Sequence, residues 1–148
     1  MDTACHYALV RFIPFVETGE FAVVGVVLFV PKANYFGYKL LSLEQNDRVT
    51  RFFQAFDAKH FQAVMHSAGT ELQRVADQFK TNRFERGSAT LDDAASFDLW
   101  NELTKPLGSI LRMDQARLAT TPDPVGKLEE LFHFYVERNQ ENSTLALK

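Results

Sequence analysis

An apolar run in the N-terminal third of the chain constrains the fold more than any other feature. Residues 21–30, FAVVGVVLFV, contain no polar side chain; Glu20 precedes the run, and Pro31 and Lys32 end it. A Val-rich run of this length predicts a strand that is covered on both faces, at the centre of a sheet. It is about half as long as a membrane-spanning helix requires. Gly25, in its middle, predicts a bulge or a close approach of neighbouring backbone.

Two further strands are expected beside this one. Residues 6–15 are rich in aromatic and β-branched side chains, which is typical of a strand, and a turn around Gly19 joins them to the apolar run. The short connection predicts an antiparallel hairpin. Residues 33–43 begin with a turn-prone segment and then alternate, so they form the third predicted strand.

Helical spacing follows, and each helix is expected to bury its apolar face. The first of these faces consists of Val49, Phe52, Phe53 and Phe56, and the second of Phe61, Val64, Met65, Ala68, Leu72, Val75, Ala76 and Phe79. A polar loop over 81–89, a short helix over 90–105 and a fourth strand over 108–120 come next. The last helix has Asp123 as its cap, Pro124 at its first position, and a face of Val125, Leu128, Leu131, Phe132, Tyr135 and Val136.

The order β-β-β-α-α-α-β-α predicts an α+β fold, with a mainly antiparallel sheet of about four strands packed against helices. A length of 148 residues suits one domain, expected over 1–140, with 141–148 as a flexible tail. A single cysteine, Cys5, and the lack of a secretory signal in the first residues indicate a cytoplasmic protein. The net charge of −3 disfavours a nucleic-acid binder, since such proteins usually carry a basic surplus.

Two blocks of sequence carry a resemblance. The first is YALVRFIPFVETGEFAVVGVVLF, with Tyr7, Arg11, Pro14, Gly19, Glu20, Val24, Gly25 and Val26; the second is LTKPLGSILRMDQARLATTPDPVGKLEELFHFYV, with Leu103, Thr104, Pro106, Arg117, Asp123, Pro124, Leu128, Leu131 and Phe132. Together they resemble a bacterial domain-of-unknown-function family, number three thousand and thirty-seven. Many members of that family have an Asn where this chain has Val23, so a site built on that Asn would be lost here.

The resemblance implies no established activity. Genes of the family often lie beside genes for HipA-like kinases, which implies a partner protein in a toxin–antitoxin or defence-like setting.

Arg11 is the charge inside the first predicted strand, and Glu20 opens the second. An arginine within an apolar strand needs a carboxylate, a carbonyl or water, because a buried unpaired charge is costly. One interpretation is an Arg11–Glu20 pair that lines a ligand cleft. The other is a structural ion pair, or an arginine that reaches solvent at a sheet edge.

The fourth predicted strand carries a second group of charges, and two interpretations of it stay open. In a regular strand Arg112 and Asp114 share a face, while Arg117 points to the other. With Arg83 and Arg86 from the loop, these residues would form an anion-binding patch. Alternatively, they are solvated charges that protect an edge strand from pairing with another chain.

The sequence holds no metal-ligand spacing, nucleophile elbow or phosphate loop, so no catalytic residue, metal or cofactor is assigned. We therefore expect a small interaction protein that binds another protein without catalysis and does not enter membranes; its oligomeric state stays open. The alternative is an enzyme, or a protein that binds a nucleotide or nucleic acid, with an anion-binding cleft made by Arg11, Glu20, Arg112 and Arg117.

Overall fold

The computed structural model describes residues 3–15, 17–30, 32, 35–42, 47–85, 110–114 and 117–137, with backbone alone for 47–48 and 79–85. Its elements, in chain order, are β1 (Thr3–Phe12), β2 (Ala22–Val30), β3 (Tyr35–Leu40), α1 (Asp47–Phe52), α2 (Ala58–Glu85), β4 (Leu111–Met113), β5 (Arg117–Thr121), α4 (Pro124–Phe132) and the π-helical turn η3 (His133–Glu137). The α+β class is confirmed.

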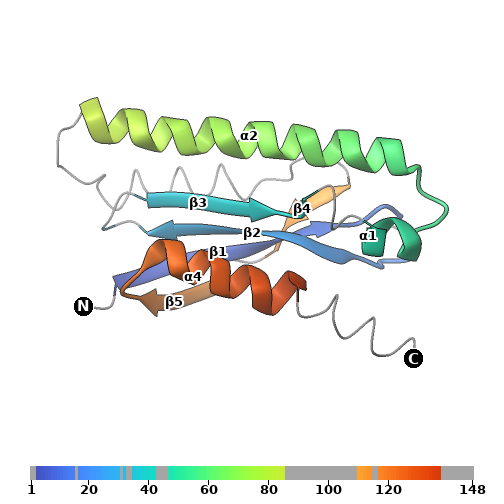
Figure 1. Cartoon of the computed structure of the whole chain (residues 1–148), viewed down its shortest axis with the longest axis horizontal. Helices are drawn as coiled ribbons and strands as arrows, with labels where there is room; N and C mark the ends of the chain where they lie inside the picture. The colour runs from blue at the N-terminus through green and yellow to red at the C-terminus, as the bar shows by residue number, and fades with distance from the viewer. Residues whose placement is uncertain are drawn as a thin grey trace.

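The strands form one antiparallel sheet in the order β3-β2-β1-β4 (Figure 1). β5 pairs directly with the first half of β1, next to β4 in the direction of the strand. β2 therefore lies inside the sheet, and every residue from Val24 to Val30 is buried. The predicted position of the apolar run is confirmed, and its hairpin with β1 is also present.

Gly25 fulfils both alternatives that the sequence left open. Val10 pairs with Gly25 but Arg11 pairs with Val23, so Val24 is an extra residue and β2 contains a bulge. A Cβ atom on Gly25 would lie 2.8 Å from the Lys39 carbonyl oxygen, which is closer than packed atoms tolerate. Glycine at this position therefore allows β3 to approach β2.

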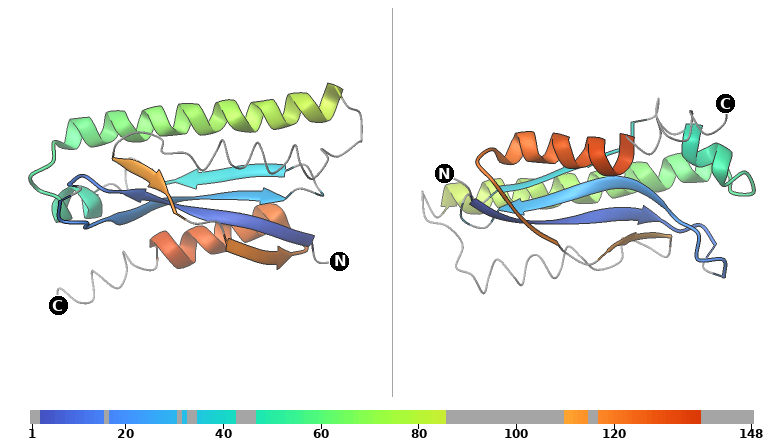
Figure 2. Two further views of the ribbon diagram at one scale, coloured as in Figure 1. Left: turned by 180° about the vertical axis from the view of Figure 1, so that it is seen from behind. Right: turned by 90° about the horizontal axis from the view of Figure 1, so that it is seen from below.

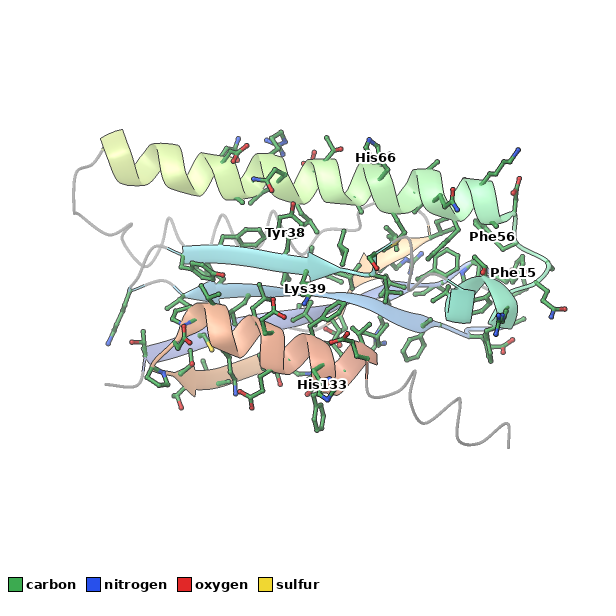
Figure 3. The ribbon with its side chains drawn as sticks, in the orientation of Figure 1. Phe15, Tyr38, Lys39, Phe56, His66 and His133 are labelled. Atoms are coloured by element: carbon green, nitrogen blue, oxygen red, sulfur yellow. The ribbon has the colours of Figure 1, made fainter. Side chains whose placement is uncertain are left out.

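Helices cover both faces of the sheet, and neighbouring residues of β3 contact different helices. The Tyr38 hydroxyl donates a hydrogen bond of 2.7 Å to Gln73 of α2, whereas the Lys39 ammonium lies 4.7 Å from the ring centroid of Phe132 in α4 (Figure 3). Because side chains alternate between faces along a strand, α2 and α4 lie on opposite faces. Large side chains fill both interfaces, among them the fully buried Phe12, Phe29, Phe61 and Phe132.

Two expectations about the first helices need correction. α2 continues to Glu85, so residues 81–85 are helical and do not belong to a loop. Their polar sequence has no apolar period, which is the signal that the prediction used.

The apolar face predicted for the preceding helix is also only partly buried. α1 ends at Phe52, whose side chain is exposed, while Phe53 is buried and Phe56 is half-buried against Phe12. The helix predicted over 90–105 and the tail over 141–148 lie outside the described residues.

The last helix begins at Pro124 with Asp123 at its N-cap position, as predicted, but the Asp123 side chain makes no capping hydrogen bond. Leu128, Leu131, Phe132 and Val136 are buried, but Val125 is exposed, contrary to expectation, because it lies in the first turn, ahead of the buried residues. Figure 2 (right) shows α4 on one side of the sheet. Within the described residues, no helix combines the length and apolarity that crossing a membrane would need.

The fourth predicted strand is two short strands. β4 pairs with Val10–Phe12 and β5 with Thr3–Tyr7, so both follow the same edge of β1 (Figure 2, left). The break between them begins at Asp114, which lies opposite Leu9: the Asp114 N–H donates a hydrogen bond of 3.0 Å to the Leu9 carbonyl.

Candidate functional site

The break in the edge strand decides which side chains meet. Asp114 lies opposite Leu9 and Arg117 lies opposite Tyr7, so three steps along the edge match two steps along β1. Because Leu9 and Tyr7 lie on the same face of β1, Arg117 emerges on the same face as Asp114. The expectation that Arg117 points to the other face is wrong, because it assumed a regular strand.

Asp114 is the centre of the resulting cluster. Its Oδ1 accepts the Leu9 N–H at 2.8 Å, and its Oδ2 accepts an Nη2–H from Arg11 at 3.3 Å and from Arg117 at 3.0 Å. The Asp114 side chain is 6% exposed, while those of Arg11 and Arg117 are 33% and 37% exposed. A buried carboxylate thus holds two guanidinium groups that are themselves partly open to solvent.

Each guanidinium also lies over an aromatic ring. The Arg11 Cζ is 4.4 Å from the ring centroid of Phe21, and the Arg117 Cζ is 5.3 Å from that of Tyr135. The turn η3 places Tyr135 over this face, where its hydroxyl lies 3.1 Å from the hydroxyl of Tyr7. Cation–π contacts of this kind restrict the guanidinium planes as well as attracting the charge.

The environment favours the charged arginine and the neutral tyrosine. Burial acts to lower the pKa of Arg117, but the charge of Asp114 and the hydroxyls of Tyr135 and Tyr7 outweigh it, so the pKa is raised. Burial, followed by the contact with Tyr135, raises the pKa of Tyr7, although Arg117 acts in the opposite direction. The surroundings therefore stabilise the charged form of Arg117 and the neutral form of Tyr7.

One donor in the cluster has no partner. The Nε atom of Arg11 is buried and makes no hydrogen bond within the described residues. A buried polar group without a partner typically costs about 1–3 kcal/mol, so this atom opposes the stability that the rest of the cluster provides.

The four residues predicted for an anion- or partner-binding site lie as follows. Arg11 and Arg117 meet at Asp114. Arg112 pairs with Arg11 across the β1–β4 ladder, so it belongs to the same face, and it is exposed. Glu20 is exposed in the turn before β2, where its N–H donates to Thr18 Oγ1 at 3.4 Å. The carboxylate that meets Arg11 is thus Asp114, and the binding role of the four residues stays a prediction.

Tyr7 and Tyr135 were not predicted for the site, and Asp114 was predicted in the charged patch of the fourth strand but not as the partner of Arg11. The need of Arg11 for a carboxylate was a usable signal, but Asp114 is 103 residues away in the chain and nothing local connects them. The two tyrosines gave no signal, because their contact depends on how η3 lies across the sheet. The side chains of Arg83 and Arg86 are outside the part of the chain that the structure describes.

The same described residues contain one buried thiol and no cluster suited to a metal ion. No group of three or more His, Cys, Asp and Glu lies close enough together to hold a metal ion. Cys5 is buried on the α4 face opposite Ala119, and burial raises the pKa of its thiol, which weakens it as a nucleophile.

Fold and site together define an α+β protein whose antiparallel sheet carries an arginine–aspartate cluster on one face. Residues 7–136 match the model of a family described as "Protein of unknown function (DUF3037)", and the chain belongs to this family. Neither the curated proteins nor the solved structures gave a significant match.

Proposed function

We propose that this chain is a non-catalytic protein-interaction module that works in the cytoplasm and binds its partner through the face around Asp114. The observation that carries the proposal is the composition of that face. Arg11, Arg112 and Arg117 lie there together with the exposed ring of Phe21 and the half-buried ring of Tyr135. Arginine and aromatic residues are enriched at protein interfaces and dominate their binding energy.

A further exposed aromatic residue extends the face. Phe134 is 45% exposed and its ring packs edge-on against Tyr135, with 4.9 Å between the centroids. Rigid aromatic side chains lose little conformational entropy when a partner covers them, so they favour binding more than flexible apolar side chains do.

The genomic setting implied by the family resemblance makes a HipA-like kinase the first candidate partner, in a toxin–antitoxin or defence-like system. A second candidate function is an enzyme or a nucleotide- or nucleic-acid-binding protein with an anion site. The convergence of Arg11 and Arg117 on one carboxylate favours it, whereas the net charge of −3 does not.

The test is affinity capture from the native host with the tagged chain. A partner that is recovered in a defined ratio, and that rebinds when both proteins are purified, supports an interaction module. Recovery of the tagged chain alone, from cells in which its gene is expressed, would contradict it.

A further inference from the structure

The partner's chemistry can be deduced from the same cluster, in an inference that rests on the proposed function. We propose that the Arg11–Arg112–Arg117 face binds a short acidic segment of the partner protein, with a carboxylate on the arginines and an apolar side chain against the neighbouring aromatic rings.

The charge of the face differs from that of the chain. Among the described residues of β1, β4 and the start of β5, three arginines and one aspartate gather on this side of the sheet, whereas the whole chain carries a net charge of −3. Opposite charge on a ligand is therefore attracted to this face and not to the molecule in general.

The arginines are prepared for an anion before it arrives. Arg11 donates one hydrogen bond to Asp114, out of the five N–H donors that a guanidinium has. Arg117 also donates one to Asp114 and interacts with the hydroxyls of Tyr135 and Tyr7. Because Asp114 is itself fixed by the Leu9 N–H, and because each guanidinium lies over a ring, their positions are restricted in the free protein. Binding then costs less side-chain entropy than it would with free surface arginines.

The aromatic side chains distinguish an acidic peptide from a simple anion. Phe21 is 46% exposed directly beside Arg11, and Phe134 adjoins Tyr135 beside Arg117, so apolar surface is next to both cations. A peptide can present a carboxylate and an apolar side chain a few residues apart and use both kinds of contact. Planar carboxylates also match the fork of a guanidinium through two parallel hydrogen bonds.

An extended polyanion fits less well. A nucleic acid gains affinity from many phosphate contacts along its length, and beyond this face it would meet a net acidic protein. A short acidic segment places its charges on the arginines and ends there.

The test uses fluorescence anisotropy with a labelled peptide in which glutamates flank one phenylalanine. The matched probe has glutamine in place of each glutamate, and inorganic phosphate and a single-stranded oligonucleotide serve as competing anions. We expect the acidic peptide to bind, the glutamine peptide to bind at least about tenfold more weakly, and added salt to weaken the acidic peptide's binding.

Variants locate the binding. Arg112→Gln should weaken the acidic peptide about fivefold to thirtyfold. Arg11→Lys keeps the charge but loses the fork and should also weaken binding, with folding verified by circular dichroism. The control is Arg74→Gln, which removes one positive charge from α2 on the opposite face and should leave the affinity unchanged.

Equal binding of the two peptides, or equal losses in all three variants, would overturn the inference. Tighter binding of the oligonucleotide, or full displacement of the peptide by phosphate alone, would also overturn it and assign the face to phosphate groups. Capture of a partner that these arginine variants leave unchanged would overturn the inference while the interaction function stands. Failure of capture bears on the interaction function, whatever the peptide does.

Discussion

The carboxylate of Asp114 accepts hydrogen bonds from the Leu9 backbone and from two arginines, one on β1 and one on β5. The Asp114 carboxylate has two roles. It accepts the Leu9 N–H at the break between β4 and β5, and it supplies the negative charge that the two guanidinium groups require. A neutral side chain of the same shape would fill the first role but not the second.

Asp114→Asn should therefore lower the free energy of unfolding by about 1–3 kcal/mol, since hydrogen bonds to charged groups are worth more than neutral ones. Urea denaturation measures this. Asp77→Asn is the matched control: Asp77 is exposed on α2 and accepts a hydrogen bond from Gln73, so it should change stability by less than about 0.5 kcal/mol. Equal losses in the two variants would show that Asp114 has no special role.

The tyrosines predict how stability depends on alkaline pH. Burial raises the pKa of Tyr7 above its ordinary value of 10.0, so the folded chain holds this proton more tightly than the unfolded chain does. That contribution is fully present below pH 10 and is lost as the pH rises through the folded-state pKa. Tyr35 and Tyr38 shift in the same direction, mainly through burial.

We expect the free energy of unfolding to fall as the pH is raised above 10, and to fall less steeply in Tyr7→Phe. Urea denaturation at a series of pH values measures both slopes. An identical alkaline slope in the variant would mean that Tyr7 titrates as it does in the unfolded chain.

Among the elements, those with a strong local period were predictable from the sequence. The apolar run of β2 and the spacing of Leu128, Leu131 and Phe132 identify a central strand and an amphipathic helix without further information. The polar end of α2 was missed, because a solvated helix leaves no apolar period. The break at Asp114 was missed for a different reason: its position depends on β1, which is distant in the chain.

The site was less predictable than the fold for the same reason. Arg11 and Arg117 were selected as charges within strands, and both belong to the cluster. Which carboxylate would meet them depended on how β4 and β5 pair with β1, and that pairing is not encoded in a local pattern. Glu20, the carboxylate closer in sequence, lies exposed in its turn.

Two glycines provide a test at the level of elements, with effects of opposite sign. Gly25→Ala places a Cβ atom 2.8 Å from the Lys39 carbonyl oxygen, so it should destabilise the β2–β3 pairing by about 1–3 kcal/mol. Gly69→Ala in α2 meets nothing closer than Leu40 Cδ1 at 3.8 Å and should stabilise the helix by about 0.5–1 kcal/mol. Thermal denaturation followed by circular dichroism measures both. A gain at Gly25 would contradict the close approach of β3 to β2, and a loss at Gly69 would contradict the space beside α2.

On the scale of the whole molecule, the sheet is stabilised by helices on both faces, and α4 and η3 supply one of these covers. Phe132 is fully buried there beneath Lys39, whereas Phe134, two residues later, is 45% exposed. At the end of this helix, Phe132 therefore belongs to the core and Phe134 to the surface.

Phe132→Ala should lower the free energy of unfolding by about 3–5 kcal/mol, through lost burial and the cavity that remains. Phe134→Ala should cost only about 1–1.5 kcal/mol, because nearly half of the Phe134 side chain stays in water when the chain folds. Chemical denaturation compares the two. A large loss at Phe134 would show that this ring supports the fold, and its use as a binding surface would then be unsupported.

The interruption at Asp114 also affects how copies of the chain meet one another. It divides the outer border of the sheet into runs of three and five residues, and a charged side chain occupies the gap between them. A strand from another chain that pairs in register with one run would be out of register with the other, so edge-to-edge polymerisation along this border is disfavoured. The break at Asp114, which brings Arg11 and Arg117 together, would therefore also disfavour fibril growth along this edge of the sheet at high concentration.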